Sequence, residues 1–368
     1  MNSEYSSILQ QFPFEGSFIK LDTIDEGHIN TTLKAEFSGA KYIIQKINTV
    51  VFTKPDELMS NIFAATEYIK HNLSAHGIDP SRRTLNFLKT NDGKMYYRDD
   101  DGNCWRSYVY IDNCYTLSEN CSAEEIFEAA RAFGEFQNML SGFDGSKLYE
   151  SIENFHNTPV RFKAFLEAVE KDPVGRVKDV AEEIEFFKAR ENETGIVTGL
   201  LARGGLPVRV THNDTKINNI LFDKDTKKAI CIIDLDTIMP GSSLYDFGDS
   251  VRSGAGTAKE DEVDFEKMTL NLDIYTAYVN GYLEGTAGSL TDKEIELLPF
   301  SSKLLTYETG IRFLTDYING DVYFRTTHPT HNLERAHTQM QLVKDIENKF
   351  EQMKEITASA AGRIKSES

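Results

Sequence analysis

Polar side chains with a fixed spacing flank two apolar runs in residues 208–249 of the 368-residue chain. His212, Asp214 and Asn219 follow the spacing H-x-D-x-x-x-x-N and lead into the apolar run ILF. A second apolar run, AICII, ends at Asp234, and the polar segment DKDTKK separates the two runs. Two apolar runs joined by a short polar segment predict a β-hairpin. Because a hairpin brings the outer ends of its strands together, we expect Asp214, Asn219 and Asp234 to converge.

This combination of residue types suits phosphoryl transfer. The reaction needs a carboxylate that orients the attacking hydroxyl, and it needs oxygen ligands for magnesium on the nucleotide phosphates. Asp214 would be the base, Asn219 and Asp234 the metal ligands, and Lys216 would neutralise charge on the transferred group. His212 would hold the loop rather than react. Asn and Asp also occur in turns for conformational reasons, which would explain one such pair but not the joint pattern.

A second acidic motif follows the hairpin. The string Asp246-Phe247-Gly248 imitates the metal-binding motif of protein kinases. The metal carboxylate should end the second hairpin strand, and Asp234 already occupies that place. We therefore expect Asp246 to cap the next helix or to tie down the catalytic loop.

THNDTKINNILFD together with IIDLDTIMPGS resembles the aminoglycoside phosphotransferase and choline kinase superfamily, and within it the N-acetylhexosamine 1-kinases. GHINTT, YIIQKIN and LLPFSSKLLTYETGIRFLTDYINGDVYF extend this resemblance over nearly the whole chain. The resemblance implies an α+β, bilobal, protein-kinase-like fold with ATP and Mg²⁺ as cofactors. It also implies that the product is a sugar 1-phosphate.

A nucleotide site is expected near the N-terminus. The turn DEGHINTT lies between two predicted strands, where backbone amides can cover phosphates. Asn30 and Thr31 are candidate phosphate contacts, and His28 is a candidate contact of substrate or phosphate. A solvated or capping role for these side chains stays open. In this superfamily adenine bonds the backbone where the lobes join, around Val109 and Ile111.

One residue departs from the family pattern. The strand YIIQKIN carries Gln45 where the superfamily usually has a phosphate-binding lysine. Alternation places Gln45 on one face of the strand and Lys46 on the other, unless a bulge changes the register. Whether Gln45 or Lys46 contacts phosphate therefore stays open, and the departure is the one feature that favours a pseudokinase.

The resemblance implies that Asp236, Arg312 and Tyr323 contribute to sugar binding. Arg312 lies midway between Glu308 and Asp316 at a spacing of four, which places the three on one helix face. Exposed charge pairing is the ordinary explanation of that spacing. Aromatic residues beside charged hydrogen-bonding groups also suit a sugar.

Composition excludes several partners. The formal net charge is -18, which argues against nucleic acid and anionic membranes because both require a basic surface. The four cysteines lack C-x-x-C spacing, which indicates a reducing compartment and no zinc site. No N-terminal run is apolar enough for a signal peptide, and no stretch approaches a membrane span. We expect a cytoplasmic monomer that binds a nucleotide and a small sugar.

Two lobes are expected. Residues 1–110 would form a small nucleotide-binding lobe of mixed strands with one helix that begins at Pro55. Residues 111–368 would form a mostly helical lobe that carries the catalytic hairpin and the sugar site. We expect single helices over residues 179–201 and 301–318, and a disordered tail after residue 361.

Three classes of function remain in view. The leading hypothesis is an ATP-dependent kinase of the anomeric hydroxyl of N-acetylglucosamine or N-acetylgalactosamine. Kinases of aminoglycosides, choline or homoserine are alternatives of the same class. A non-catalytic pseudokinase that binds nucleotide or sugar belongs to a second class. A hydrolase built on His212 and Asp214 belongs to a third, but no nucleophile lies in a recognisable elbow.

Overall fold

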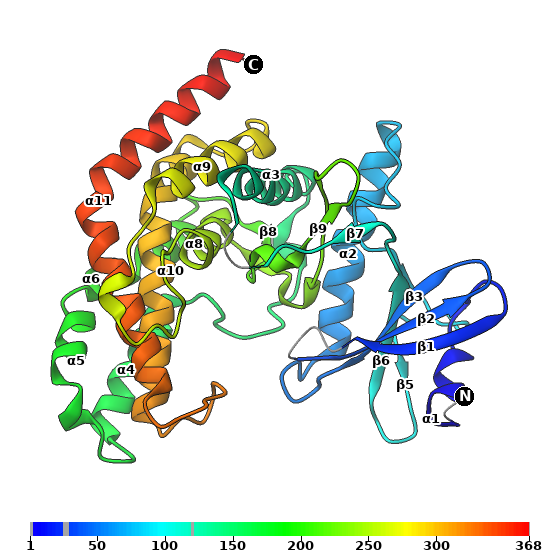
Figure 1. Ribbon diagram of the computed structural model, residues 1–368, viewed down its shortest axis with the longest axis horizontal. Helices are drawn as coiled ribbons and strands as arrows, with labels where there is room; N and C mark the ends of the chain where they lie inside the picture. Colours follow the sequence, from blue (N-terminus) through cyan, green and yellow to red (C-terminus); the bar gives the residue numbers. More distant parts are fainter. Residues whose placement is uncertain (1–2, 25–28, 119–120, 368) are drawn as a thin grey trace.

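The computed structural model describes residues 3–24, 29–118 and 121–367. Figure 1 shows a sheet at one end of the molecule and a group of helices at the other, with α2 beside the sheet. The arrangement is the expected α+β one, with a small N-terminal lobe and a larger helical lobe. Among the described helices, none is long and apolar enough to cross a membrane.

The N-terminal lobe is built on one antiparallel sheet with the order β1-β2-β3-β6-β4, in which β5 also pairs with β6. The strands are β1 (Phe18–Ile24), β2 (Thr31–Phe37), β3 (Lys41–Ile47), β4 (Phe87–Leu88), β5 (Tyr97–Arg98) and β6 (Cys104–Val109). The short helix α1 (Ser3–Leu9) covers one face, where Ile8 packs with Ile44 and Trp105. The helix α2 (Pro55–Ala75) begins at the predicted proline.

The C-terminal lobe contains helices and two small sheets. Its helices are α3 (Ala123–Met139), α4 (Thr158–Lys171), α5 (Ala181–Lys188), α6 (Glu191–Thr194), α7 (Ile196–Ala202), α8 (Ser243–Gly254), α9 (Leu272–Thr286), α10 (Asp292–Ile318) and α11 (His331–Glu367). One sheet joins β7 (Cys114–Tyr115), β9 (Ile220–Asp223) and β10 (Ala229–Ile232), and the other pairs β8 (Arg209–Thr211) with β11 (Met239–Gly241). The predicted hairpin is confirmed, because β9 and β10 are antiparallel neighbours.

Three expected boundaries were wrong. The single helix over residues 179–201 is divided into α5, α6 and α7. The helix at 301–318 is the second half of α10, which continues through Pro299 although proline removes one helical hydrogen bond. Leu298, Pro299 and Phe300 are all buried, so tertiary packing outweighs the local cost. The tail expected to be disordered continues α11 to Glu367.

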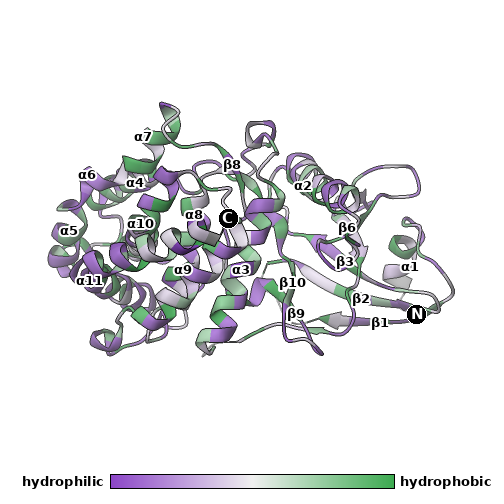
Figure 2. Ribbon diagram, turned by 90° about the horizontal axis from the view of Figure 1, so that it is seen from above, coloured by the Kyte–Doolittle hydropathy of each residue, from purple (hydrophilic) through white to green (hydrophobic). Residues whose placement is uncertain are grey.

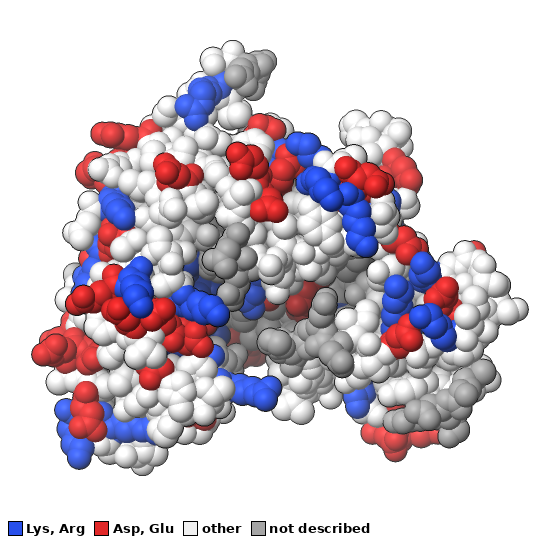
Figure 3. Space-filling model, in the orientation of Figure 1, with Lys and Arg blue, Asp and Glu red and all other residues white. Residues whose placement is uncertain are grey.

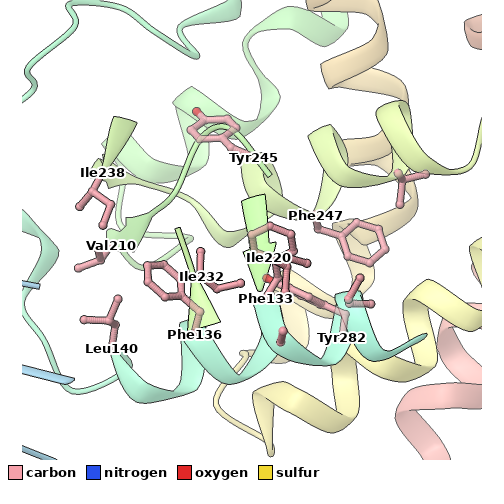
Figure 4. Packing of buried hydrophobic residues seen from close by; sticks show 14 of the residues in the cluster. Phe133, Phe136, Leu140, Val210, Ile220, Ile232, Ile238, Tyr245, Phe247 and Tyr282 are labelled. Atoms are coloured by element: carbon pink, nitrogen blue, oxygen red, sulfur yellow. The ribbon is translucent and has the colours of Figure 1, made fainter. Parts of the chain in front are cut away.

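The main hydrophobic core extends from α2 and the N-terminal sheet into the helical lobe, where it surrounds the hairpin. Phe133 and Phe136 from α3 pack with Ile220 and Ile232 from the hairpin, and Phe247 joins them from α8 (Figure 4). In Figure 2 the helices alternate between hydrophobic and hydrophilic positions, as expected for elements that bury one face. The core therefore fixes the hairpin, whose ends carry the candidate catalytic residues.

Glycines allow α3 and α9 to pack closely. A Cβ atom at Gly281 would lie 2.2 Å from the carbonyl oxygen of Phe127, and one at Gly285 would lie 2.1 Å from that of Arg131. Gly134 approaches α9 in the same way from α3. Backbone atoms cannot move aside as the end of a side chain can, so any larger residue must separate the two helices.

We predict that Gly281→Ala lowers the free energy of unfolding by about 1–3 kcal/mol, because overpacking forces the helices apart. Gly362→Ala is the matched control, since it lies in α11 and a Cβ there meets no heavy atom within 4 Å. The control should be neutral or stabilising by up to about 1 kcal/mol. Urea unfolding measures both, and equal stabilities would contradict the close approach.

Candidate active site

The loop between β8 and β9 carries the predicted base at the end of the hairpin. A short 3₁₀ turn (Ile217–Asn219) leads into β9, and the amide of Ile233 donates to the carbonyl oxygen of Asn219 at 2.9 Å. This bond lies just before Asp234, so the two ends of the hairpin meet as expected. Asp234 has a left-handed backbone with φ of 57°, a conformation that concentrates at functional sites in residues other than glycine.

Asp214 is bound on both carboxylate oxygens. Lys216 Nζ lies 2.9 Å from Oδ1, and Asn219 Nδ2 donates to Oδ2 at 3.3 Å and to the Asp214 carbonyl oxygen at 2.9 Å. The Asp214 side chain remains 27% exposed, so an incoming hydroxyl can reach it. Burial lowers the pKa of Lys216, but Asp214 outweighs it, and the pKa is raised.

His212 is fully buried beneath the loop. Its Nε2 lies 2.9 Å from the carbonyl oxygen of Ile233, and the amide of Asp214 donates to its Nδ1 at 3.3 Å. The ring packs against the edges of Phe133 and Phe136. Both ring nitrogens are thus engaged with the backbone of the site, which suits a holding role and leaves the ring no free position for chemistry.

Asp246 ties the loop down. It lies inside α8, whose N-cap is Ser242, and it is 1% exposed. Its Oδ2 accepts the His212 amide at 2.9 Å and its Oδ1 accepts the Asn213 amide at 2.8 Å. Gln137 from α3 donates to Oδ2 at 2.8 Å. Of the two roles predicted for Asp246, the structure shows the loop contact and assigns the helix cap to another residue.

Carboxylates crowd the end of the hairpin. Asp234 is exposed at the end of the hairpin. Burial, together with Asp236 and Asp214, raises the pKa of Asp234 to about 6. Figure 3 shows the surface hollowed between the lobes, with acidic and basic side chains along the hollow. A divalent cation would relieve this repulsion, so the oxygen donors of Asp234 and Asn219 fit a magnesium ion.

The N-terminal lobe supplies a cation that sequence reasoning missed. Arg106 on β6 lies directly opposite Gln45 on β3, and its side chain is 3% exposed. Its Nη1 forms an ion pair with Asp236, and its Nε and Nη2 donate to Gln45 Oε1 at 3.0 Å and 2.8 Å. Asn30 Nδ2 donates to the other oxygen of Asp236 at 2.6 Å. The structure thus places Asp236 against N-terminal residues rather than beside Arg312 and Tyr323.

The other nucleotide candidates lie on the inner strands β2, β3 and β6 of the sheet and just after β6. The β2–β3–β6 register is regular, so Gln45 and Lys46 stay on opposite faces. Thr31 is exposed at the start of β2. The amide of Val109 donates to Asn86 at 3.0 Å, and the Ile111 carbonyl oxygen accepts from the Cys114 thiol at 3.0 Å. His28 lies outside the described residues.

The expected charged face of α10 is mostly buried. Glu308 is 1% exposed and Asp316 is 4% exposed, so simple exposed pairing was the wrong explanation. Asp316 accepts backbone amides of the following loop, including that of Tyr323 at 2.8 Å. The Arg312 guanidinium lies 5.9 Å from the Tyr323 ring and 5.8 Å from the Phe155 ring. The predicted pair Arg312 and Tyr323 is therefore brought together.

We predict that Asp246→Asn lowers the free energy of unfolding by about 1–3 kcal/mol, because one remaining oxygen cannot accept both loop amides and Gln137. Asp273→Asn, an exposed residue of α9, is the control and should change stability by less than about 0.5 kcal/mol. Urea unfolding gives both values. Loss of turnover in Asp246→Asn with unchanged stability would place this carboxylate in the chemistry instead.

Comparisons with known proteins agree with this geometry. The family described as "Phosphotransferase enzyme family" matches residues 100–277, a segment that runs from β6 into α9 and includes the catalytic hairpin. Spectinomycin phosphotransferase APH(9)-Ia, in complex with ADP and spectinomycin, has a TM-score of 0.56 at 13% identity and covers 95% of this chain and 98% of its own.

Two further solved structures are kinases of small amino alcohols by their names. The microcompartment-associated aminopropanol kinase has a TM-score of 0.60 at 12% identity, over 95% of this chain and 97% of its own. The ethanolamine kinase of Plasmodium vivax has a TM-score of 0.53 at 16% identity, over 87% of this chain and 82% of its own. These likenesses confirm the kinase-like fold class. The family match covers less than half of the chain, and the segment it covers carries the hairpin with the candidate catalytic residues.

Proposed function

We propose that this chain transfers the γ-phosphoryl group of ATP to the anomeric hydroxyl of an N-acetylhexosamine, with Mg²⁺ as cofactor. The observation that carries the proposal is the convergence of Asp214, Asn219 and Asp234 at the end of one hairpin. The anomeric position and the N-acetyl group come from the sequence resemblance. Residues 1–110 would hold the nucleotide, and residues 111–368 would hold the sugar.

Asp214 acts as the base in this proposal. The sugar oxygen forms a bond to the γ-phosphorus, the bond from that phosphorus to the bridging oxygen breaks, and ADP leaves with the electron pair. The hydroxyl proton moves to Asp214, whose free access and two holding contacts orient it. Lys216 lies beside the same carboxylate and offsets charge on the transferred group.

Asn219 and Asp234 would hold the metal. Bound there, a magnesium ion would neutralise phosphate charge. The raised pKa of Asp234 means that a proton competes for this site below a pH of about 6. The spectinomycin phosphotransferase structure contains ADP, which supports a nucleotide at the corresponding hollow of this chain.

The charge of the acceptor side favours a neutral substrate over a cationic one. Arg312 and Arg161 both contact Phe155, and within the described residues neither forms an ion pair. Phe155 lines a pocket that Asn213, the neighbour of Asp214, also borders. Glu308 offsets part of the charge of the two guanidinium groups, and the remaining positive charge opposes a polycationic aminoglycoside or choline near the base. A neutral sugar avoids that repulsion and can accept hydrogen bonds from the guanidinium groups.

Arg106 offers an answer to the missing strand lysine. It places a positive charge one strand away from Gln45, and it stays charged because Asp236 outweighs the effect of burial. This charge would face the nucleotide phosphates, as the lysine does in the superfamily. The presence of this cation weakens the pseudokinase alternative, which rested on Gln45 alone.

The function is tested by product analysis. With ATP and Mg²⁺, phosphorus NMR should show N-acetylglucosamine or N-acetylgalactosamine phosphorylated at position 1, and the 1-O-methyl glycoside should be inert. Asp214→Asn should lower kcat about 10²–10⁴-fold with little change in nucleotide binding, as expected for loss of a positioned base. Phosphate on the 6-hydroxyl, or turnover of choline or an aminoglycoside instead, would refute the sugar 1-kinase assignment.

A second prediction concerns the phosphate contact. Arg106→Gln should raise the KM for ATP at least about tenfold, because a charge-assisted contact is lost. Lys46→Gln is the matched control. Lys46 follows Gln45, the partner of Arg106, and lies on the opposite face of the sheet, so this variant should leave the KM for ATP unchanged. Steady-state kinetics distinguish the two, with thermal unfolding to show that Arg106→Gln is folded. A larger effect of Lys46→Gln would assign the contact to that lysine.

A further inference from the structure

A small pocket adjoins the catalytic loop. Its volume is about 150 Å³, and its lining includes Asn213 from the loop, Met239 from β11, Tyr245 from α8 and His156 from the segment before α4. A water molecule occupies roughly 30 Å³ in the liquid, so the pocket accommodates a group of several heavy atoms. It opens beside the residue that precedes the base, where part of an acceptor would lie.

His156 contributes an unused hydrogen-bonding atom to this pocket. Its side chain is 7% exposed, and its Nδ1 lies 2.8 Å from Oε1 of Glu308. Its Nε2 is buried and has no hydrogen-bond partner in the described part of the chain. Buried polar atoms are nearly always satisfied, so an unsatisfied one in a pocket wall points to a ligand.

Glu308 decides what that atom can do. It is buried in α10 and accepts from the Thr158 hydroxyl at 2.6 Å as well as from His156. Burial would raise its pKa, but His156 and Thr158 outweigh burial and hold the pKa below its usual value. Because an ionised carboxylate only accepts hydrogen bonds, Nδ1 carries the proton shared with Glu308, and Nε2 is the ring nitrogen left for a ligand.

The other walls mix polar residues, among them Glu150, Asn157 and Thr198, with apolar and aromatic ones. The Tyr245 ring lies against His156 with centroids 5.1 Å apart and planes at 34°. Figure 4 shows that the Tyr245 hydroxyl points away from the other labelled core side chains. Leu201, Met239 and Pro240 complete the apolar part of the lining. The pocket therefore combines hydrogen-bonding groups, including the unpartnered Nε2 of His156, with an apolar surface suited to a methyl group.

We propose that this pocket receives the acetamido group of the acceptor. The amide N–H donates to His156 Nε2, and the methyl group packs against Leu201 and Met239. His156 is then the residue that distinguishes an acetamido sugar from one with a hydroxyl at the same carbon, and Glu308 is a positioning residue that fixes the tautomer. This inference rests on the proposed sugar kinase function.

Glu308→Gln tests the tautomer with little change of shape. The glutamine amide can donate to Nδ1, which moves the imidazole proton to Nε2 and sets two N–H groups against each other. We expect kcat/KM for N-acetylglucosamine to fall about 10–100-fold, as for one lost and one opposed hydrogen bond. The kcat/KM for glucose and the KM for ATP should stay near their wild-type values.

Two further variants make the test selective. His156→Phe keeps a ring against Tyr245 but removes the acceptor, so it should lower the preference for the acetamido sugar in the same way. Glu183→Gln is the matched control, because Glu183 also pairs with a histidine: its Oε1 lies 2.7 Å from Nε2 of His337. Neither residue lines the pocket. This variant should leave both sugars unaffected.

The outcomes separate this inference from the proposed function. Wild-type turnover of N-acetylglucosamine with an unchanged sugar preference in Glu308→Gln and His156→Phe overturns the inference alone. An equal loss on both sugars shows that the pair supports the fold and also overturns it. A wild-type protein that phosphorylates neither sugar overturns the proposed function, and the inference with it.

Discussion

The geometry of the site depends on one buried carboxylate. Asp246 accepts the consecutive amides of His212 and Asn213, and this fixes the direction in which the chain enters the catalytic loop. Asn213 has a left-handed backbone with φ of 64°, which the two bonds stabilise against its usual conformational preference. Asp214 follows immediately, so its orientation depends on a buried residue of α8 that lies outside the loop.

The position of Asp246 is set in turn by helix packing. Its neighbour Gly248 lies so close to α10 that a Cβ atom there would be 2.4 Å from the carbonyl oxygen of Ser301. Phe247, on the other side, packs against Tyr278 and Tyr282 of α9. The α8 helix is therefore packed between α9 and α10. This packing fixes the position of Asp246, and through Asp246 it fixes the loop.

Sequence reasoning succeeded where local pattern and structure coincide. The hairpin follows from spacing alone, because its strands are joined by a short segment of neighbouring residues. Arg106 was missed because its significance arises only when β6 pairs with β3 and sets it opposite Gln45. The sequence analysis did not predict that these two strands pair, and such a prediction is the signal that could have found Arg106.

The same limit applies to buried charge. Glu308 lies on a helix face that reads as solvated in sequence, yet it is buried with His156, which lies 152 residues earlier in the chain. Nothing in a single sequence links two residues so far apart. Net charge is equally uninformative about local charge: the chain carries -18 overall, while the cations Arg161 and Arg312 both lie beside Phe155.

The contacts of Asp236 also have a mechanical meaning. This carboxylate follows the hairpin of the helical lobe, but its two partners, Arg106 and Asn30, belong to the sheet lobe. The contacts of Asp236 thus join the two lobes across the hollow. Asn30 in turn accepts a hydrogen bond from the backbone amide of Asn48 at 2.9 Å. Rotation of one lobe against the other must lengthen the contacts of Asp236 with Arg106 and Asn30. These contacts therefore favour one angle between the lobes, and they couple movement of the sheet to movement of the end of the hairpin.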